Sequence, residues 1–185
     1  MTRSFSSKVA AVVATSGLAV GTLVGLAGPA AAVDTIATFA ITGGSLSVAV
    51  PASTVALSTG TVNTGAATAT AQLGSVAVTD NRGALVNTWT TTVGSTTFVT
   101  GAGTDASQVV AKANVAYSSG TATSTSGLGA FVPGTLASMA TNGTGAAWAG
   151  LAGNNTAAWN PTLVFTLLSS QVAGTYTGTI SHSVA

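Results

Sequence analysis

Residues 175–184 read Thr-Tyr-Thr-Gly-Thr-Ile-Ser-His-Ser-Val, which is the clearest structural pattern in the sequence. Every second residue is Thr or Ser, and the residues between them include Tyr176, Ile180 and Val184. Successive side chains of a β-strand point to opposite faces of a sheet. The stretch therefore predicts a half-buried strand, with hydroxyls on one face and apolar side chains on the other.

Similar alternation upstream predicts further strands at 45–50, 75–79, 84–93 and 162–168. Thr and Val suit strands because a side chain branched at Cβ packs well on a pleated surface. Many short strands separated by turn residues are typical of sandwiches and barrels. We therefore expect an all-β domain, folded as a two-sheet antiparallel β-sandwich with Greek-key-like connections.

Charged residues make up only 4% of the 185 residues, whereas globular proteins average about 25%. Thr, Ser, Asn and Gly take their place on the expected surface, which stays soluble through hydroxyls and amides. So few cations cannot form a basic patch, so nucleic acid is excluded as a partner. Electrostatic steering of a charged ligand is excluded for the same reason.

The N-terminal stretch has the three parts of a secretory signal. Arg3 and Lys8 precede an apolar run at 9–27, and Ala30 to Ala32 provide the small residues at which such signals are cleaved. We expect a helical signal peptide at 1–32, cleavage after Ala32, and contact with the membrane only during export. A retained membrane anchor is the alternative, because the apolar run approaches transmembrane length.

The remaining residues, 33–185, suit a single all-β domain. Asp80 to Gly83 is predicted to be a hairpin turn, because Asp and Asn tolerate the bend and Gly supplies positive φ. The stretches at about 118–129 and 135–155 are rich in Ser, Thr and Gly and are predicted to be long polar surface loops. A short helix at 146–152 is an alternative within the second loop.

Six residues are candidates for binding a ligand: Trp89, Trp148, Trp159, Asp80, Asn81 and Arg82. Indole rings stack on the apolar faces of sugars, while neighbouring polar side chains bind the hydroxyls. Trp89 and Trp159 have a second interpretation, as core residues of the sandwich. Trp148 falls in the predicted loop, so we expect it to be exposed.

The titratable side chains are too few for most catalysis. After Ala32 the acids are Asp34, Asp80 and Asp105, the only histidine is His182, and the chain has no Cys or Glu. Sugar hydrolysis normally needs two carboxylates, a serine nucleophile needs a base, and zinc needs several His or Cys ligands. We therefore expect no enzymatic activity, no cofactor and no metal, and we expect His182 to be partly buried near the end of the last strand. Calcium bound by Asp80, Asn81 or Asp105 stays open as an alternative.

Three stretches carry a resemblance to a known family. They are Leu-Ser-Val-Ala-Val-Pro at 46–51, the run 73–83 followed by 89–93, which begins Trp89-Thr90-Thr91, and the C-terminal strand at 173–184. In this order and spacing they resemble the WxL-type cell-wall-binding domains of Gram-positive bacteria. Trp89 keeps the family's first Trp, whereas His182-Ser183-Val184 stands where the second Trp-x-Leu is expected, so the chain looks like a divergent, actinobacterial-type branch.

The resemblance implies an exported domain held non-covalently on peptidoglycan or associated glycan, often beside other surface proteins. We therefore expect a secreted, non-enzymatic protein located at the cell wall or cell surface. The alternative is a structural surface-layer or adhesin-type subunit that assembles with itself or with sister proteins. Edge strands without charged residues favour such pairing.

Export of the full chain from a Gram-positive host should yield a protein that begins at Val33, as read by N-terminal sequencing. Ala32→Leu should block this cleavage, because the site requires small residues, whereas Ala27→Leu should leave it intact. Wild-type protein that stays in the membrane fraction with residues 1–32 attached would support the anchor instead.

Overall fold

The computed structural model describes residues 35–51 and 62–185. The predicted signal peptide and its cleavage site lie outside these residues. The chain divides into two units, 1–40 and 41–185. In the first unit, 35–40 are exposed and have no regular secondary structure. Within the described residues, no helix is long and apolar enough to cross a membrane.

In the described residues of the second unit, the regular secondary structure is β-strand apart from two single-turn 3₁₀ helices, η1 and η2. The elements are β1 Leu46–Ala49, β2 Thr68–Gln72, β3 Val76–Asp80, β4 Trp89–Ser95, β5 Phe98–Val99, η1 Ala106–Gln108, β6 Val109–Val110, η2 Lys112–Asn114, β7 Val115–Ser118, β8 Ala122–Ser126, β9 Gly129–Pro133, β10 Thr135–Leu136, β11 Gly143–Gly150, β12 Asn155–Trp159, β13 Thr162–Thr166 and β14 Ile180–Val184.

One layer of the sandwich consists of two four-stranded sheets placed end to end. Their orders are β1-β3-β12-β8 and β10-β7-β13-β2. β2 leads into β3, β7 into β8 and β12 into β13, so three long segments run through both sheets with a short break in each. At the break after β12, Pro161 has no N–H for the ladder, and its carbonyl instead accepts a hydrogen bond of 2.9 Å from the Leu73 N–H.

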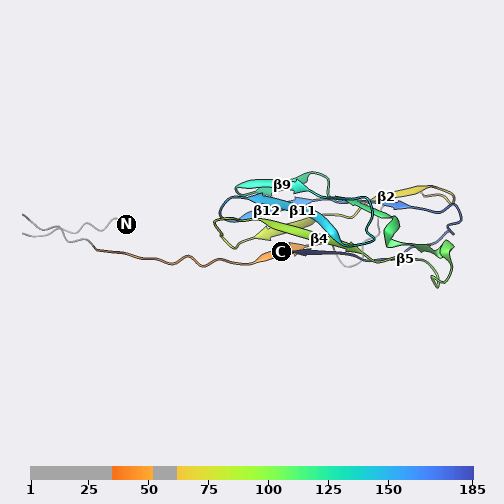
Figure 1. Ribbon diagram of the computed structural model, residues 1–185, viewed down its shortest axis with the longest axis horizontal. Helices are drawn as coiled ribbons and strands as arrows, with labels where there is room; N and C mark the ends of the chain where they lie inside the picture. The colour runs from red at the N-terminus through yellow and green to blue at the C-terminus, as the bar shows by residue number, and fades with distance from the viewer. Residues whose placement is uncertain (1–34, 52–61) are drawn as a thin grey trace, which may run out of the picture. The chain divides into compact units, whose positions relative to one another are not determined.

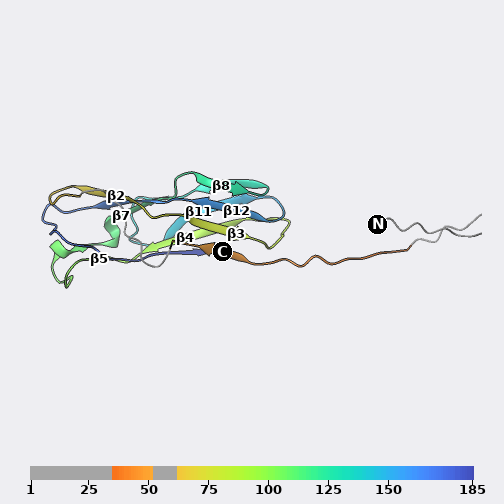
Figure 2. The ribbon, with the colours of Figure 1, turned by 180° about the vertical axis from the view of Figure 1, so that it is seen from behind.

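The other layer is the sheet β14-β4-β11-β9, extended by the small β5-β6 sheet. β9 and β12 lie toward one end of the folded unit, and β2 and β5 lie toward the other (Figures 1 and 2). All strand pairs are antiparallel, and most neighbours are distant in sequence, such as β3 with β12 and β4 with β11. The predicted all-β, antiparallel sandwich-like fold is confirmed, although its two layers contain four sheets where the sequence predicted two.

Two hydrophobic clusters fill the space between the layers. One contains Val76, Val78, Ala146 and Ala157 with the three tryptophans. The other contains Val93, Val115, Tyr117, Met139, Leu163 and Phe165, among others. The period-two pattern explains which side chains reach them: in β13, Leu163 and Phe165 are buried while Thr166 is exposed.

The prediction of long loops at 118–129 and 135–155 is wrong. The stretch 118–129 contains β8, and 135–155 contains β10 and β11, so neither the loops nor a helix at 146–152 forms. β8 lies at a sheet edge with four of its five residues exposed. Because it buries little, its sequence does not have to alternate between apolar and polar residues. β11 lies between β4 and β9, where small residues fit: a Cβ on Gly145 would lie 3.1 Å from the Thr91 hydroxyl oxygen.

The predicted hairpin at Asp80 to Gly83 is also wrong, because β3 and β4 belong to different layers and the turn carries the chain between them. Gly83 does have the expected positive φ, 64°. Two predicted strands are shorter than expected. β4 begins at Trp89, and β14 begins at Ile180 after a single bridge between Thr177 and Val99.

Trp159→Ala should lower the free energy of unfolding by about 3–5 kcal/mol, because it removes a large, fully buried side chain. Urea denaturation followed by circular dichroism measures this difference. Leu85→Ala is the matched control, since Leu85 is 89% exposed and its loss should change stability by about 0.5 kcal/mol or less. Equal effects of the two substitutions would contradict the assignment of Trp159 to the core.

Candidate functional site

Three connections converge at the end of the sandwich near β9 and β12. They are 81–88 between β3 and β4, 127–128 between β8 and β9, and 151–154 between β11 and β12, and we call them together the loop end. Backbone hydrogen bonds tie them to one another, from Gly153 N–H to the Ala84 carbonyl (3.0 Å) and from Leu151 N–H to the Leu128 carbonyl (3.1 Å). Asn81 and Arg82, predicted as ligand-binding residues, lie here, and Asp80 directly precedes them.

Asp80 and Arg82 form a bidentate ion pair. Asp80 Oδ1 accepts from the Arg82 backbone N–H and from Nε, both at 3.0 Å, and Oδ2 accepts from Nη2 at 2.7 Å. The hydrogen bond from the Arg82 side chain lowers the pKa of Asp80, against the opposing effect of burial. Both carboxylate oxygens are thus engaged by Arg82, so Asp80 is neither a free base nor a free calcium ligand.

Arg82 also fixes the start of β4. Its Nη2 donates to the Thr88 carbonyl at 2.8 Å and to Asn87 Oδ1 at 3.4 Å. Asn87 is fully buried, and its Nδ2 donates to the Gly153 carbonyl of the neighbouring connection. One cationic side chain and one buried amide therefore hold two connections of the loop end together.

The tryptophans form a stacked ladder inside the core. Trp89 lies between Trp148 and Trp159, with ring centroids 6.3 Å apart on both sides and interplanar angles of 14° and 18°. Trp89 and Trp159 are core residues, as one of the two interpretations predicted. The expected exposure of Trp148 is wrong: it is 3% exposed, because β11 is an inner strand. None of the three rings offers a free face to a sugar.

The ladder is joined to the loop end through a buried amide. Trp89 Nε1 donates to Asn155 Oδ1 at 2.7 Å, and Asn155 is the first residue of β12. Asn155 Nδ2 and Trp148 Nε1 are buried without a hydrogen-bond partner in the described part of the chain. Asn87 and Asn155 were not predicted from the sequence. The placement of an Asn shortly before Trp89 and before Trp159 is the only hint the sequence contains.

A polar hollow of about 440 Å³ opens on the loop end. Its lining consists of Ile41, Thr42, Gly43, Asn81, Arg82, Gly83, Gly153 and Asn154. Asn81 and Asn154 are exposed, and the Arg82 side chain is 37% exposed beside its carboxylate partner. Amides supply both donors and acceptors, so this hollow suits a neutral ligand rich in hydroxyls.

Glycine shapes the walls of the polar hollow. A Cβ on Gly43 would lie 2.4 Å from the Arg82 carbonyl oxygen, so only glycine allows the two backbone segments to approach this closely. Gly153 has φ of 82°, in the left-handed region that favours glycine. Much of the wall is therefore backbone held at fixed positions.

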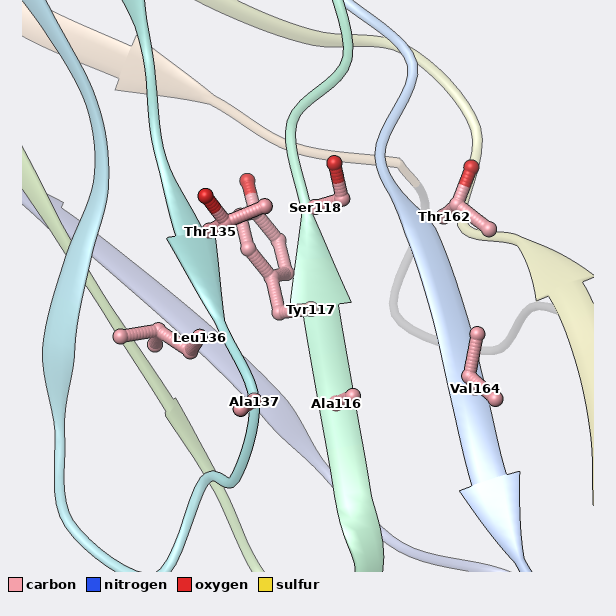
Figure 3. A pocket seen from close by; sticks show the side chains of 8 residues that line it. All are labelled: Ala116, Tyr117, Ser118, Thr135, Leu136, Ala137, Thr162 and Val164. Carbon is pink, nitrogen blue, oxygen red and sulfur yellow. The ribbon is translucent and has the colours of Figure 1, made fainter.

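A second hollow, of about 280 Å³, lies on the sheet formed by β7, β10 and β13 (Figure 3). Its lining side chains are small or apolar, including Ala116, Leu136 and Val164. Tyr117 is its one titratable side chain, and burial raises the pKa of Tyr117 to about 12. Tyr117 also accepts a hydrogen bond of 3.0 Å from Trp159 Nε1, so its role here is in packing.

Among the described residues, the remaining titratable side chains do not gather near the polar hollow. Asp105 caps η1, where its Oδ1 accepts from the Ser107 N–H at 2.9 Å, and this hydrogen bond lowers the pKa of Asp105. η1 leads into β6, which pairs with β5 at the end of the folded unit away from β9 (Figure 1). Asp80 and Asp105 therefore do not meet. Among the described residues, no group of three His, Cys, Asp or Glu is placed to hold a metal ion.

His182 is half-buried in β14, as predicted. Its ring lies 5.8 Å from that of Tyr117, and both ring nitrogens are buried without a hydrogen-bond partner among the described residues. Burial lowers the pKa of His182 to about 4. The imidazole is thus neutral at pH 7 and fills space beside the core.

The free energy of unfolding should fall as the pH drops from about 6.5 toward 4. In that window the unfolded chain, with an ordinary histidine pKa of about 6.5, binds a proton that the folded protein excludes. Urea midpoints measured from pH 7.5 to 4.5 test this, and His182→Phe should flatten the profile because the chain has no other histidine. An NMR titration placing the folded His182 near 6.5 would contradict the expectation.

A scan against known protein families, a search of curated proteins and a search of solved structures each found no match to this chain. The resemblance to WxL-type domains therefore remains a prediction from the sequence motifs.

Proposed function

We propose that this protein is a non-catalytic, exported surface protein that attaches non-covalently to cell-wall glycan through the polar hollow of the loop end. The observation that carries the proposal is the lining of this hollow. It presents the exposed amides of Asn81 and Asn154 beside Arg82, in a space of about 440 Å³. That volume lies within the range of small-molecule binding sites.

The chemistry of the polar hollow suits a neutral saccharide. The carboxamides pair with hydroxyls as donor and acceptor, and Arg82 adds N–H groups whose charge Asp80 already balances. Hydrogen bonds, direct or through water, would supply the affinity, so binding should depend only weakly on salt. The buried tryptophans take no part in contact, and their role in this proposal is to support the connections that form the hollow.

Absence of catalysis is part of the proposal. Asp80 is engaged by Arg82, Asp105 lies at the other end of the folded unit, and His182 is enclosed beside Tyr117. No two of these groups are placed to act together as acid and base. General acid–base chemistry requires positioned groups within hydrogen-bond reach of the reacting atoms.

Co-sedimentation with purified Gram-positive cell walls should carry the protein into the pellet, at low and at high salt. The double substitution Asn81→Ala with Asn154→Ala should weaken this binding by about thirtyfold, since it removes two amides worth about 1 kcal/mol each. Asn63→Ala is the matched control, because Asn63 is exposed, lies before β2 and does not line the polar hollow.

Protein that stays in the supernatant at both salt concentrations would contradict attachment to the wall. Equal pelleting of the double variant and the Asn63→Ala control would contradict the assignment to the polar hollow.

Self-assembly is the second candidate function, and the sheet edges favour it. The edge strands β1, β2, β8, β9, β10 and β14 contain no charged residue. Lysines and other charges on edge strands are a common defence against pairing between molecules. Light scattering across concentration separates the candidates: a monomer that pellets with walls supports attachment, and self-association without pelleting supports assembly.

A further inference from the structure

The most exposed large aliphatic side chains of the folded unit gather at its loop end. Four of them, which we call the aliphatic tips, are Leu85 (89% exposed), Val86 (73%), Leu151 (67%) and Leu128 (64%). Ile41, at 86%, lines the adjacent polar hollow. Elsewhere in the described residues of this unit, exposure of large aliphatic side chains does not exceed the 50% of Val50.

The aliphatic tips come from three different connections that are fixed to one another. Leu151 N–H donates to the carbonyl of Leu128, and Gly153 N–H donates to the carbonyl of Ala84, the residue before Leu85. These hydrogen bonds hold the three connections that carry the tips next to one another. They also satisfy backbone groups internally, which lowers the cost of moving this surface into an apolar medium.

The loop end carries almost no charge. Arg82 is the one charged residue in its three connections, and it is paired with Asp80. Asp105 and Lys112 lie before and after β6, at the other end of the folded unit. No uncompensated charge therefore has to be dehydrated when the tips approach an apolar surface.

We propose that the aliphatic tips insert into the surface of a lipid layer whose headgroups carry no net charge. Exposed apolar patches mark contacts with proteins or with membranes. A specific protein interface needs about 800 Å² and 20–30 residues from each partner, far more than four side chains supply. A lipid surface has no such minimum, because each aliphatic side chain gains from burial on its own. This contact goes beyond glycan attachment and does not depend on it.

Site-specific fluorescence tests the insertion. The natural chain has no Cys, so one introduced cysteine labelled with the environment-sensitive dye NBD reports a single position. In the full chain, the label on Leu128→Cys should shift to shorter wavelength when phosphatidylcholine vesicles are added. The label on Val172→Cys should not shift, since the Val172 N–H donates to the Ser107 carbonyl of η1 and Val172 belongs to none of the connections of the loop end. Both proteins carry the same residues 1–34, so their difference reports on the loop end.

Removing the neighbouring tips should weaken the response to vesicles. Leu85→Ser with Leu151→Ser, added to the labelled Leu128→Cys protein, should raise the vesicle concentration needed for half of the shift by about a hundredfold. Leu168→Ser is the matched control: Leu168 is 47% exposed, follows β13, and should leave the shift unchanged.

Three results would overturn the proposal. They are no shift at Leu128→Cys with vesicles, an equal shift at Val172→Cys, and a shift that appears with protein concentration in the absence of lipid. The last would identify the tips as a contact between copies of the chain. Cell walls free of lipid decide glycan attachment separately, so either proposal can fail while the other stands.

Discussion

The hydrogen bond from Trp89 Nε1 to Asn155 Oδ1 joins the interior of this protein to its candidate binding surface. Trp89 is the middle ring of the ladder and belongs to one layer, whereas Asn155 opens β12 in the other. Because an unpaired buried indole N–H or amide is costly, this bond fixes how the two layers meet at the loop end. Next to it, Asp80 and Arg82 fix the path of the chain from one layer to the other. The positions of the three connections at the loop end depend on these two contacts.

A surface made of hydroxyls and amides has different properties from a charged one. Its interactions are short-ranged and change little with ionic strength, because few charges are present to be screened. Such a surface also lacks the repulsion that keeps many proteins apart. The polar hollow and the aliphatic tips therefore lie on a surface that carries few charges.

The sequence predicted the fold class because period-two alternation is a local property. In β3, β13 and β14 it identified correctly which side chains face inward. It failed at β8 and β11, where Ser, Thr, Gly and Ala gave no alternation and were taken for loops. β8 is an exposed edge, and β11 is buried through close packing of small residues, which depends on strands far away in sequence. The polar hollow also depends on contacts between residues distant in sequence. Asn81 and Arg82 were predicted, whereas Asn154 lies beside them only because the fold brings its connection there.

The three long segments of one layer are all interrupted between the same two sheets, so the layer has one boundary that crosses it. This boundary separates the tryptophan cluster from the cluster around Phe165, so each half has its own interior. Trp159 and Tyr117 connect these interiors by a hydrogen bond across this boundary, and Leu73 packs against both clusters. A force pulling the ends of the unit apart would therefore be carried from one half to the other by side chains as well as by strands.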